Sequence, residues 1–529
     1  MHKFNTRNKL AIGCVAGLAL VLSGCGDAPE RNTRPEESTY ANSIEATSDY
    51  DPEAHFDWAY RDSAPSWDPI KSTAGSNIVF FEPVYDRLLY EEVDGTIAPM
   101  LATDFSAAED GSAFTLTLRE GLTFSDGEPF DGDAVKFNLD RARAEGSTLA
   151  SELAQVENVE VVDEHTVTLH LSGGVGPIPA TLAARSGIMV SPAAADSGQL
   201  DSQPVGIGAY TVTNYVPGDK TEYEATPDYW DPDAQRVATM TFHVMTDDQT
   251  RLNALKSGEL DGAEIPADQV DVLADDGFVP LVQSSARYTY FLLNAAKEPF
   301  DDPEVRTAIN LAIDREGISQ GLYGGYCTPQ IHPFAEGSAG YSDKIGNGLD
   351  ALPYDPEQAM TLLEDAGVTD LKFTIGAPNI ASNTKLAEAI QEQLADVGID
   401  AEVESAPTDA VVQKFVSDQS IEAITSIGSG VNDPDVPNSR YIKEDAYLNA
   451  GGVSYPDLIK YGDEGAAALE ADDRRPAYEK YLESWISDPP HLIPICLTHE
   501  SSVYTPQVSG VKQKANGYPD LRGVAVTDA

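Results

Sequence analysis

Basic residues are scarce in this chain of 529 residues, which has 34 lysines and arginines against 87 aspartates and glutamates. The formal net charge of −53 argues against nucleic acid as a partner, because phosphate repels so acidic a surface. The charge does not identify a cationic ligand. A solvated surface that keeps the protein soluble, as in a salty habitat, is the simpler interpretation.

The sequence also lacks the reactive motifs expected of an enzyme of this size. It has no Gly-x-Ser-x-Gly elbow, no Walker loop and no His-Glu-x-x-His motif. The 8 histidines are scattered, and none has metal-ligand spacing with a cysteine or carboxylate. We therefore expect neither catalysis nor a metal or other cofactor.

Long apolar runs are missing except near the start of the chain. Basic residues within positions 2–9, apolar residues 10–22 and the small residues Ser23 and Gly24 have the layout of an export signal. The apolar run is too short to cross a bilayer, which needs about 20 residues. The pattern predicts a signal peptide over residues 1–24 rather than a buried helix.

Cysteine is rare, with 4 in the chain, and Cys14 lies inside the signal segment. Cys25 directly follows Leu-Ser-Gly, an order that resembles the lipobox of bacterial lipoproteins, whose cysteine is acylated. The resemblance implies a lipid anchor at Cys25. Cys327 and Cys496 remain, and in an exported protein they form either a disulfide or two separate buried thiols.

Residues 25–52 hold few apolar residues and show no periodicity, so they cannot bury enough surface to offset their ordering entropy. We predict a flexible tether there, with an r.m.s. span of roughly 30 Å. The rest of the chain is too long for one compact core, so two or more domains are expected.

From residue 53 the patterns of strands and helices alternate. Residues 238–245 resemble a strand, Asp247 can cap a helix that Gly258 closes, and residues 258–265 resemble the next strand. Such strand–helix–strand units form parallel sheet with right-handed crossovers, which predicts an α/β fold. Further predicted helix caps are Asp302, Asp355 and either Asp131 or Asp133.

A series of blocks in fixed order resembles the family 5 solute-binding proteins of ATP-driven importers, the dipeptide-, oligopeptide- and nickel-binding group. These blocks span residues 81–105, 111–142, 205–230, 251–262, 290–318 and 391–404. The most specific block carries, in register with the family, Arg119, Gly121, Phe124, Asp126, Gly127, Pro129 and Val135.

The resemblance implies a two-lobed periplasmic-binding-protein fold of type II (cluster C), with the lobes joined by a two-strand hinge. Residues 53–288, completed by 499–529, would form lobe I from two subdomains, and residues 291–492 would form lobe II. The chain would cross between the lobes near residues 290–294 and return near 493–498.

The same resemblance implies a function in transport. We expect a monomeric lipoprotein on the outer face of the cytoplasmic membrane that captures a peptide and delivers it to an importer permease and its ATPase. Within the fold, the alternative ligands are a nickel chelate, a sugar or an opine-like compound. Outside transport, the alternatives are a sensor, an adhesin or a secreted hydrolase.

The resemblance also bears on the ligand site. In peptide-binding members an aspartate near an Asp-Pro-Asp sequence pairs with the peptide ammonium. Matching Asp433-Pro434-Asp435 to that pattern puts Gly430 in the place of this aspartate, and the tryptophan usual before it is absent. The ammonium clamp is therefore missing unless Asp433 substitutes for it. The alternative role for Asp433 and Asp435 is an Asx-turn pair.

Other candidate ligand residues come from separate parts of the chain. Tyr290 lies on the expected crossing strand, and Arg440 can bind a carboxylate bidentately, although a plain surface role is the alternative. Trp67 is expected in the cleft, with the core as the alternative. The remaining candidates are Ser66, Gly428 and Leu497.

Overall fold

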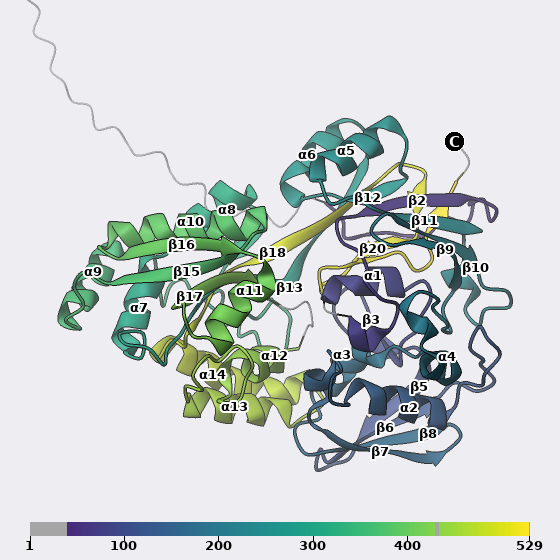
Figure 1. The fold of residues 1–529 in the computed structure, drawn as a ribbon, viewed down its shortest axis with the longest axis horizontal. Helices are drawn as coiled ribbons and strands as arrows, with labels where there is room; N and C mark the ends of the chain where they lie inside the picture. The colour runs from purple at the N-terminus through teal and green to yellow at the C-terminus, as the bar shows by residue number, and fades with distance from the viewer. Residues whose placement is uncertain (1–39, 73, 429–432, 528–529) are drawn as a thin grey trace, which may run out of the picture. The chain divides into compact units, whose positions relative to one another are not determined.

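The fold is given by a computed structural model, which describes residues 40–72, 74–428 and 433–527 (Figure 1). Its largest sheet has 11 strands in the order β16-β15-β17-β13-β18-β12-β2-β11-β10-β9, with β14 paired to β18. The two longest strands, β13 (Val279–Leu293) and β18 (Leu492–Tyr504), are antiparallel neighbours. The other strands of this sheet are β2 (His55–Tyr60), β9 (Tyr210–Val216), β10 (Lys220–Ala225), β11 (Thr239–Val244), β12 (Gly262–Glu264), β14 (Cys327–Pro329), β15 (Lys372–Pro378), β16 (Asp400–Ala406) and β17 (Ala423–Ile427).

The two long strands take part in both halves of this sheet. β13 has 15 residues and is therefore roughly 50 Å long, at about 3.3 Å per residue. Its first part pairs with the end of β18, which also pairs with β12, whereas its second part pairs with β17. The register of β13 against β18 shifts between Ser284 and Tyr288 and again between Thr289 and Tyr290, and the second shift adjoins the predicted crossing at 290–294. One continuous strand carries no turn signal to mark the crossing.

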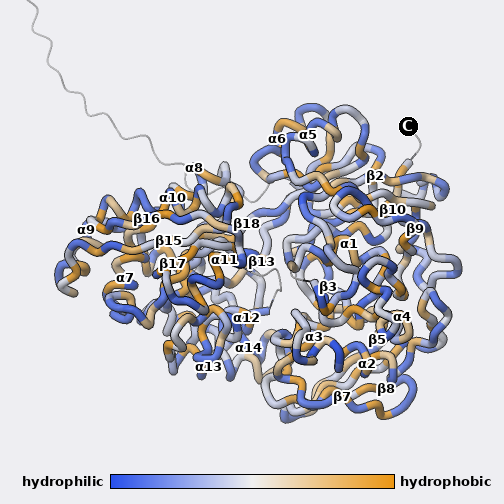
Figure 2. Tube along the Cα trace, in the orientation of Figure 1, coloured by the Kyte–Doolittle hydropathy of each residue, from blue (hydrophilic) through white to orange (hydrophobic). Residues whose placement is uncertain are grey.

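Buried apolar side chains form separate cores before and after the shift between Ser284 and Tyr288. We call lobe I the part built around the cores that contain Trp58 and Leu255, and lobe II the part built around the cores that contain Phe291 and Tyr481. The predicted domain boundaries stay a prediction. Turns around α5 (Asp248–Ser257) and α6 (Val270–Asp275) on lobe I are largely hydrophilic (Figure 2).

Lobe I contains a second, antiparallel sheet in the order β5-β6-β8-β7, whose strand β7 contacts helix α2 (Gly132–Ala142). Its strands are β5 (Ala102–Ala107), β6 (Ala113–Leu118), β7 (Val156–Asp163) and β8 (Thr166–Leu171). Smaller strand pairs are β3 (Leu89–Glu91) with β4 (Ile97–Pro99), and β19 (Val508–Ser509) with β22 (Ala525–Val526). Further lobe I helices are α1 (Ile78–Phe81), α3 (Ile178–Leu182) and α4 (Pro192–Ser197).

Lobe II contains the parallel pairs β15–β16 and β15–β17, with α10 (Ala381–Asp396) contacting all three strands. The other helices are α7 (Pro303–Ala312), α8 (Arg315–Tyr323), α9 (Pro356–Asp365), α11 (Thr408–Val412), α12 (Asp435–Pro437), α13 (Pro456–Ala466) and α14 (Ala471–Ser487). Across the described parts of the chain, no helix combines the length and apolar character that a membrane span requires.

The predicted helix caps are confirmed, and of the two candidates for α2 the cap is Asp131 rather than Asp133. Asp247 accepts a hydrogen bond from the amide of Thr250 at 2.8 Å, and the helix ends at Gly258 in the left-handed conformation with φ of 77°. The caps of three other helices also accept from the first-turn amides, namely Asp131, Asp302 and Asp355. Each side chain satisfies an amide that has no partner inside the helix.

The predicted tether over residues 25–52 is wrong in its second half. Strand β1 (Ser43–Ile44) pairs with β20 (Val511–Gln513), which in turn pairs with β21 (Pro519–Asp520). The side chain of Ile44 packs against the lobe I core, and the carbonyl of Ala41 accepts from the amide of Val282. Backbone pairing with a distant strand orders this segment despite its polar composition. The predicted lipidation site, Cys25, lies outside the described residues.

Candidate functional site

Three tyrosines gather where β13 enters lobe II. Tyr288 and Tyr290 are two residues apart on β13 and therefore point to the same face of the strand. The ring of Tyr441, on the π-helical turn η9 (Asn438–Ile442), lies 5.4 Å from that of Tyr290 and 6.4 Å from that of Tyr288, centroid to centroid. All three are buried. The sequence singled out only Tyr290, although the two-residue period of a strand also indicated Tyr288.

Arg440 precedes Tyr441 on the same turn, and Arg440 is exposed to solvent. The charged or ionisable groups that act on its guanidinium are the three tyrosines and, from lobe I, the carboxylate of Glu152. That carboxylate accepts hydrogen bonds from Arg185 at 2.9 Å and from Ser186 at 2.6 Å. Glu152 thus has its hydrogen-bond donors within lobe I, and Arg440 forms no ion pair with any residue that the structure describes, so its positive charge can act on an anionic group.

Asp433 has an ionic partner that the sequence did not indicate. Its two carboxylate oxygens accept hydrogen bonds from Nη1 and Nη2 of Arg474, on α14, at 2.7 and 2.8 Å. Oδ1 also accepts from the amide of Asp435 at 2.8 Å, which is the Asx turn considered as the alternative role. Burial would lower the pKa of Arg474, but the adjacent carboxylate raises it above its ordinary value.

Asp435 lies next to this ion pair and is also buried. Its Oδ1 accepts from the side-chain amide of Asn438 at 3.3 Å. Burial and, to a smaller extent, the neighbouring charge of Asp433 raise the pKa of Asp435, Lys443 opposes the shift, and the resulting pKa is about 7. Near neutral pH this carboxyl group therefore retains part of its proton, which makes it a weak partner for a ligand cation.

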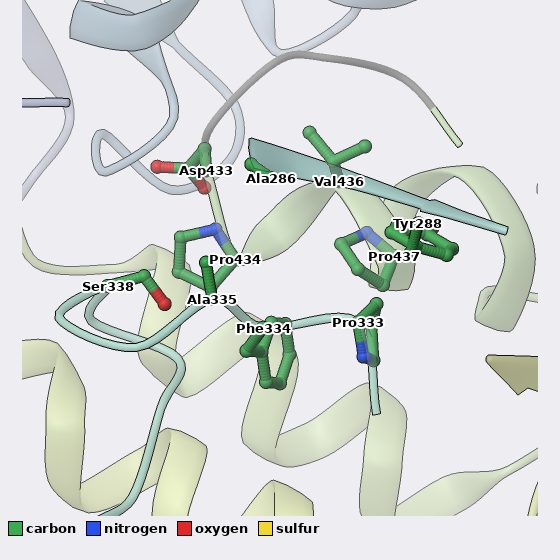
Figure 3. A pocket seen from close by; sticks show the side chains of 10 residues that line it. All are labelled: Ala286, Tyr288, Pro333, Phe334, Ala335, Ser338, Asp433, Pro434, Val436 and Pro437. Atoms are coloured by element: carbon green, nitrogen blue, oxygen red, sulfur yellow. The ribbon is translucent and has the colours of Figure 1, made fainter. Parts of the chain in front are cut away.

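A pocket lies against this ion pair (Figure 3). It is lined by residues of β13, of the segment after Gln330, and of α12 with the two residues before it. These are Ala286, Tyr288, Pro333, Phe334, Ala335, Ser338, Asp433, Pro434, Val436 and Pro437. Most of this lining is apolar. The buried hydroxyl of Ser338 has no hydrogen-bond partner among the residues that the structure describes.

Gly428 and Leu497 support this region from two other strands. The amide of Gly428, which directly follows β17, donates to the carbonyl of Tyr288 at 2.7 Å, and a Cβ at Gly428 would lie 2.8 Å from the Tyr288 ring. Leu497 pairs with Tyr288 across β13 and β18 and is buried. Both residues therefore fix the position of Tyr288. Gly430 lies outside the described residues.

Ser66 and Trp67 do not join the other candidates. The expectation that Trp67 lines a cleft is wrong, because its side chain is fully buried in the lobe I core and its ring lies 5.5 Å from that of Tyr215. Ser66 donates to Asp201 at 2.9 Å and accepts from the amide of Asp68 at 3.1 Å, which accounts for its hydroxyl locally. Trp67 is buried although its chain neighbours are polar, because burial of the large apolar area of a tryptophan ring stabilises the fold.

Cys327 on β14 and Cys496 on β18 are joined by a disulfide, with the two sulfurs 2.04 Å apart and the Cα atoms 5.4 Å apart. Both residues are fully buried in lobe II. Within the described ranges, no three histidine, cysteine, aspartate or glutamate side chains lie close enough to hold a metal ion. Burial lowers the pKa of His332 to about 4, so this side chain is neutral at physiological pH.

Two solved structures share this fold. The PBP AgaA of A. tumefacien R10, in complex with agropinic acid, has a TM-score of 0.78 at 23% identity and covers 90% of this chain and 99% of its own. DppA of Helicobacter pylori, in complex with the peptide STSA, has a TM-score of 0.77 at 23% identity and covers 91% of this chain and 99% of its own. At this identity the likeness concerns the fold.

The sequence itself matches a family over most of its length. The glutathione-binding protein GsiB of Salmonella paratyphi A is 32% identical over 327 residues, which are 60% of this chain and 63% of GsiB. The match thus spans less than two thirds of that relative. Residues 96–446 match the profile of the bacterial extracellular solute-binding proteins, family 5 middle region. The chain belongs to the family 5 bacterial extracellular solute-binding proteins and has their two-lobed type II fold.

Proposed function

We propose that this protein captures a peptide between its two lobes and delivers it to the permease and ATPase of an importer, without catalysing a reaction. The family assignment and the 32% identity to a glutathione-binding protein support this role. Glutathione is itself a tripeptide that carries two carboxylates. In such a protein the ligand favours the closed arrangement, because it contacts both lobes at once.

The observation that carries the proposal is the position of Arg440 beside the tyrosines of β13 and η9. An exposed guanidinium next to aromatic rings can bind a carboxylate bidentately while the rings contact the apolar parts of the ligand. The charge of Glu152, in lobe I, acts on Arg440, so an anion bound to Arg440 would lie near groups of both lobes.

The same region is poorly suited to bind a free ammonium group. Asp433 is fully engaged by Arg474, and Asp435 is buried with a pKa of about 7. The proposed ligand is therefore a peptide held chiefly through a carboxylate. An opine-like or other non-peptide acid is the second candidate, because the same anchor would serve it.

The binding test compares peptides that differ only at the carboxylate. We expect glutathione or a pool of di- to pentapeptides to raise the melting temperature, since a ligand of the native state stabilises it. C-terminally amidated peptides and the variant Arg440→Ala should weaken binding about tenfold or more. The matched control is Lys385→Ala, which removes an exposed positive charge from α10.

Each other outcome selects a different function. Equal binding of free and amidated peptides would contradict the carboxylate anchor. A shift with nickel–histidine, a sugar or an opine but with no peptide would replace the ligand class. Peptides returned cleaved would indicate a hydrolase, and a gene that lies apart from permease and ATPase genes would favour a sensor or an adhesin.

We also propose that residues 1–24 direct export and that acylated Cys25 anchors a monomer to the outer face of the cytoplasmic membrane. The basic start, the apolar stretch and the Leu-Ser-Gly-Cys order support this location. The variant Cys25→Ala should move the protein from the membrane fraction to the medium. Continued membrane retention of this variant would contradict the anchor.

A further inference from the structure

A glycine-rich segment of lobe I contacts lobe II next to the Asp433–Arg474 pair. Residues 173–176 connect β8 to α3, and the amide of Gly176 donates to the carbonyl of Ala466, at the end of α13, at 2.8 Å (Figure 1). A Cβ at Gly174 would lie 2.2 Å from that same carbonyl oxygen. Only a residue without a side chain permits this approach, so the two lobes meet here backbone to backbone.

The corner between α13 and α14 extends this contact. Leu469 in this corner packs against the core of lobe I, although its own chain neighbours belong to lobe II. The carbonyl of Ala467 comes within 3.0 Å of the position that a Cβ of Gly111 would occupy. Residues 466–469 therefore contact lobe I through the apolar side chain of Leu469 and through several close backbone approaches.

Arg474 joins this contact to the wall of the pocket. Its five N–H groups are all used, with Nε donating to Gly465 O at 2.9 Å and Nη2 to the Tyr478 hydroxyl at 3.4 Å as well as to Asp433. Nη1 donates both to Asp433 at 2.7 Å and to the carbonyl of Gly176 in lobe I at 3.4 Å. One guanidinium thus bridges the residue that begins the pocket wall and the segment of the opposite lobe.

At this corner few interactions among the described residues cross between the lobes. Separation of the lobes at this corner would break the Gly176–Ala466 hydrogen bond, the long bond from Arg474 to Gly176, and the packing of Leu469. Arg474 would keep Asp433 and Gly465 as partners, so no buried charge would be left unpaired. Such a contact can form and break without unfolding either lobe.

We propose that Arg474 is a positioning residue that couples the pocket wall at residues 433–437 to a latch between the lobes, formed by residues 173–176 and 466–469. The latch favours the closed arrangement, and ligand contacts with the pocket wall favour the latch. This inference rests on the proposed solute-binding function, but the latch itself can be measured without any ligand.

The test uses adjacent glycines of one loop. Gly174→Ala and Gly176→Ala place a Cβ against lobe II, 2.2 Å from Ala466 O and 2.7 Å from Ala468 O, respectively. Gly173→Ala is the matched control, because its Cβ would meet only Gln155 of lobe I, at 3.2 Å. None of these three glycines has a positive φ, so alanine fits the backbone in each case.

The first measurement is hydrogen exchange without ligand, combined with small-angle scattering. We expect Gly174→Ala to lose protection at the Gly176 amide and at residues 466–469, and to increase the radius of gyration, with the rest of both lobes unchanged. Protection and size identical to those of Gly173→Ala would overturn the latch. Loss of protection throughout both lobes would also overturn it, because the contact would then be a permanent part of the core.

The second measurement is the affinity for glutathione and for the di- to pentapeptide pool. Gly176→Ala and Arg474→Lys should each weaken binding about tenfold, and the double variant should be no weaker than either single variant, because both act through one contact. Additive losses, or lower stability with unchanged affinity for Arg474→Lys, would make Arg474 merely structural. If the wild type binds no peptide but the exchange result holds, the peptide assignment fails and the latch stands.

Discussion

The carboxylate of Asp433 and the guanidinium of Arg474 form a bidentate ion pair that is almost completely buried, with side-chain exposures of 5% and 6%. Removing one member of such a pair leaves an uncompensated charge away from water. We expect Asp433→Asn to lower the free energy of unfolding by about 3–5 kcal/mol, measured from the urea midpoint.

The control for this substitution is an exposed ion pair on the same lobe. Lys344 is 66% exposed and pairs with Glu479 and Glu483 of α14. We expect Lys344→Met to leave the urea midpoint nearly unchanged, because solvent screens the pair. Equal losses for Asp433→Asn and Lys344→Met would show that burial does not strengthen the Asp433–Arg474 pair.

Trp67 provides a test of core against cleft. The ring is fully buried and contacts the rings of Phe81, Tyr215 and Tyr223, all within lobe I. We expect Trp67→Ala to lower the free energy of unfolding by about 3–5 kcal/mol and to leave peptide affinity at temperatures below unfolding unchanged. Isothermal titration of the folded variant checks this, and a selective loss of affinity would return Trp67 to the ligand site.

The features that the sequence predicts correctly are local ones. An aspartate before a helix, such as Asp247 or Asp302, satisfies amides only two or three residues away, so neighbouring letters contain the whole interaction. The strand–helix–strand alternation likewise gives the α/β class. The order of conserved-looking blocks then gives the family, which the match over residues 96–446 confirms.

The features that it does not predict depend on distant partners. Asp433 lies 41 residues from Arg474, and no local pattern separates this arginine from Arg475, which pairs with Asp472 near the surface. The order of residues 40–44 depends on pairing with a strand near the other end of the chain. Trp67 is misplaced for the same reason, because its aromatic neighbours come from three other elements.

The disulfide between Cys327 and Cys496 closes a loop of 169 residues by sequence separation. Cross-links over loops of this size typically stabilise by about 2–4 kcal/mol. We expect the double variant Cys327→Ala/Cys496→Ala to lose about that much stability, measured as the urea midpoint in the absence of reductant. Wild-type protein in dithiothreitol should approach the same midpoint once the buried bond is reduced, whereas the variant should not respond to dithiothreitol. Two alkylatable thiols in native, oxidised wild type would contradict the cross-link.

Glu91 connects stability to pH through a carboxyl group buried beneath the C-terminal segment. Its Oε2 accepts from the side-chain amide of Asn516 at 2.8 Å, while Oε1 has no partner among the described residues. Burial raises the pKa of Glu91 to about 7, although Lys514 and Arg87 oppose the shift. Glu82 is the nearby acid, and its charge contributes to this raised pKa.

The direction of the pH effect follows from this raised pKa. Between pH 4.5 and 7 the native state keeps a proton that the unfolded chain has released, so this group stabilises the fold at low pH and the contribution is lost as the pH rises through 7. Glu91→Gln keeps the acceptor for Asn516 but carries no charge. We expect this variant to exceed the wild type at pH 8 by up to about 3 kcal/mol and to match it at pH 4.5. Urea midpoints at the two pH values check this, with Glu109→Gln as an exposed control that should show no such change. A constant difference between Glu91→Gln and wild type at both pH values would mean that Glu91 is already ionised in the native protein at pH 4.5.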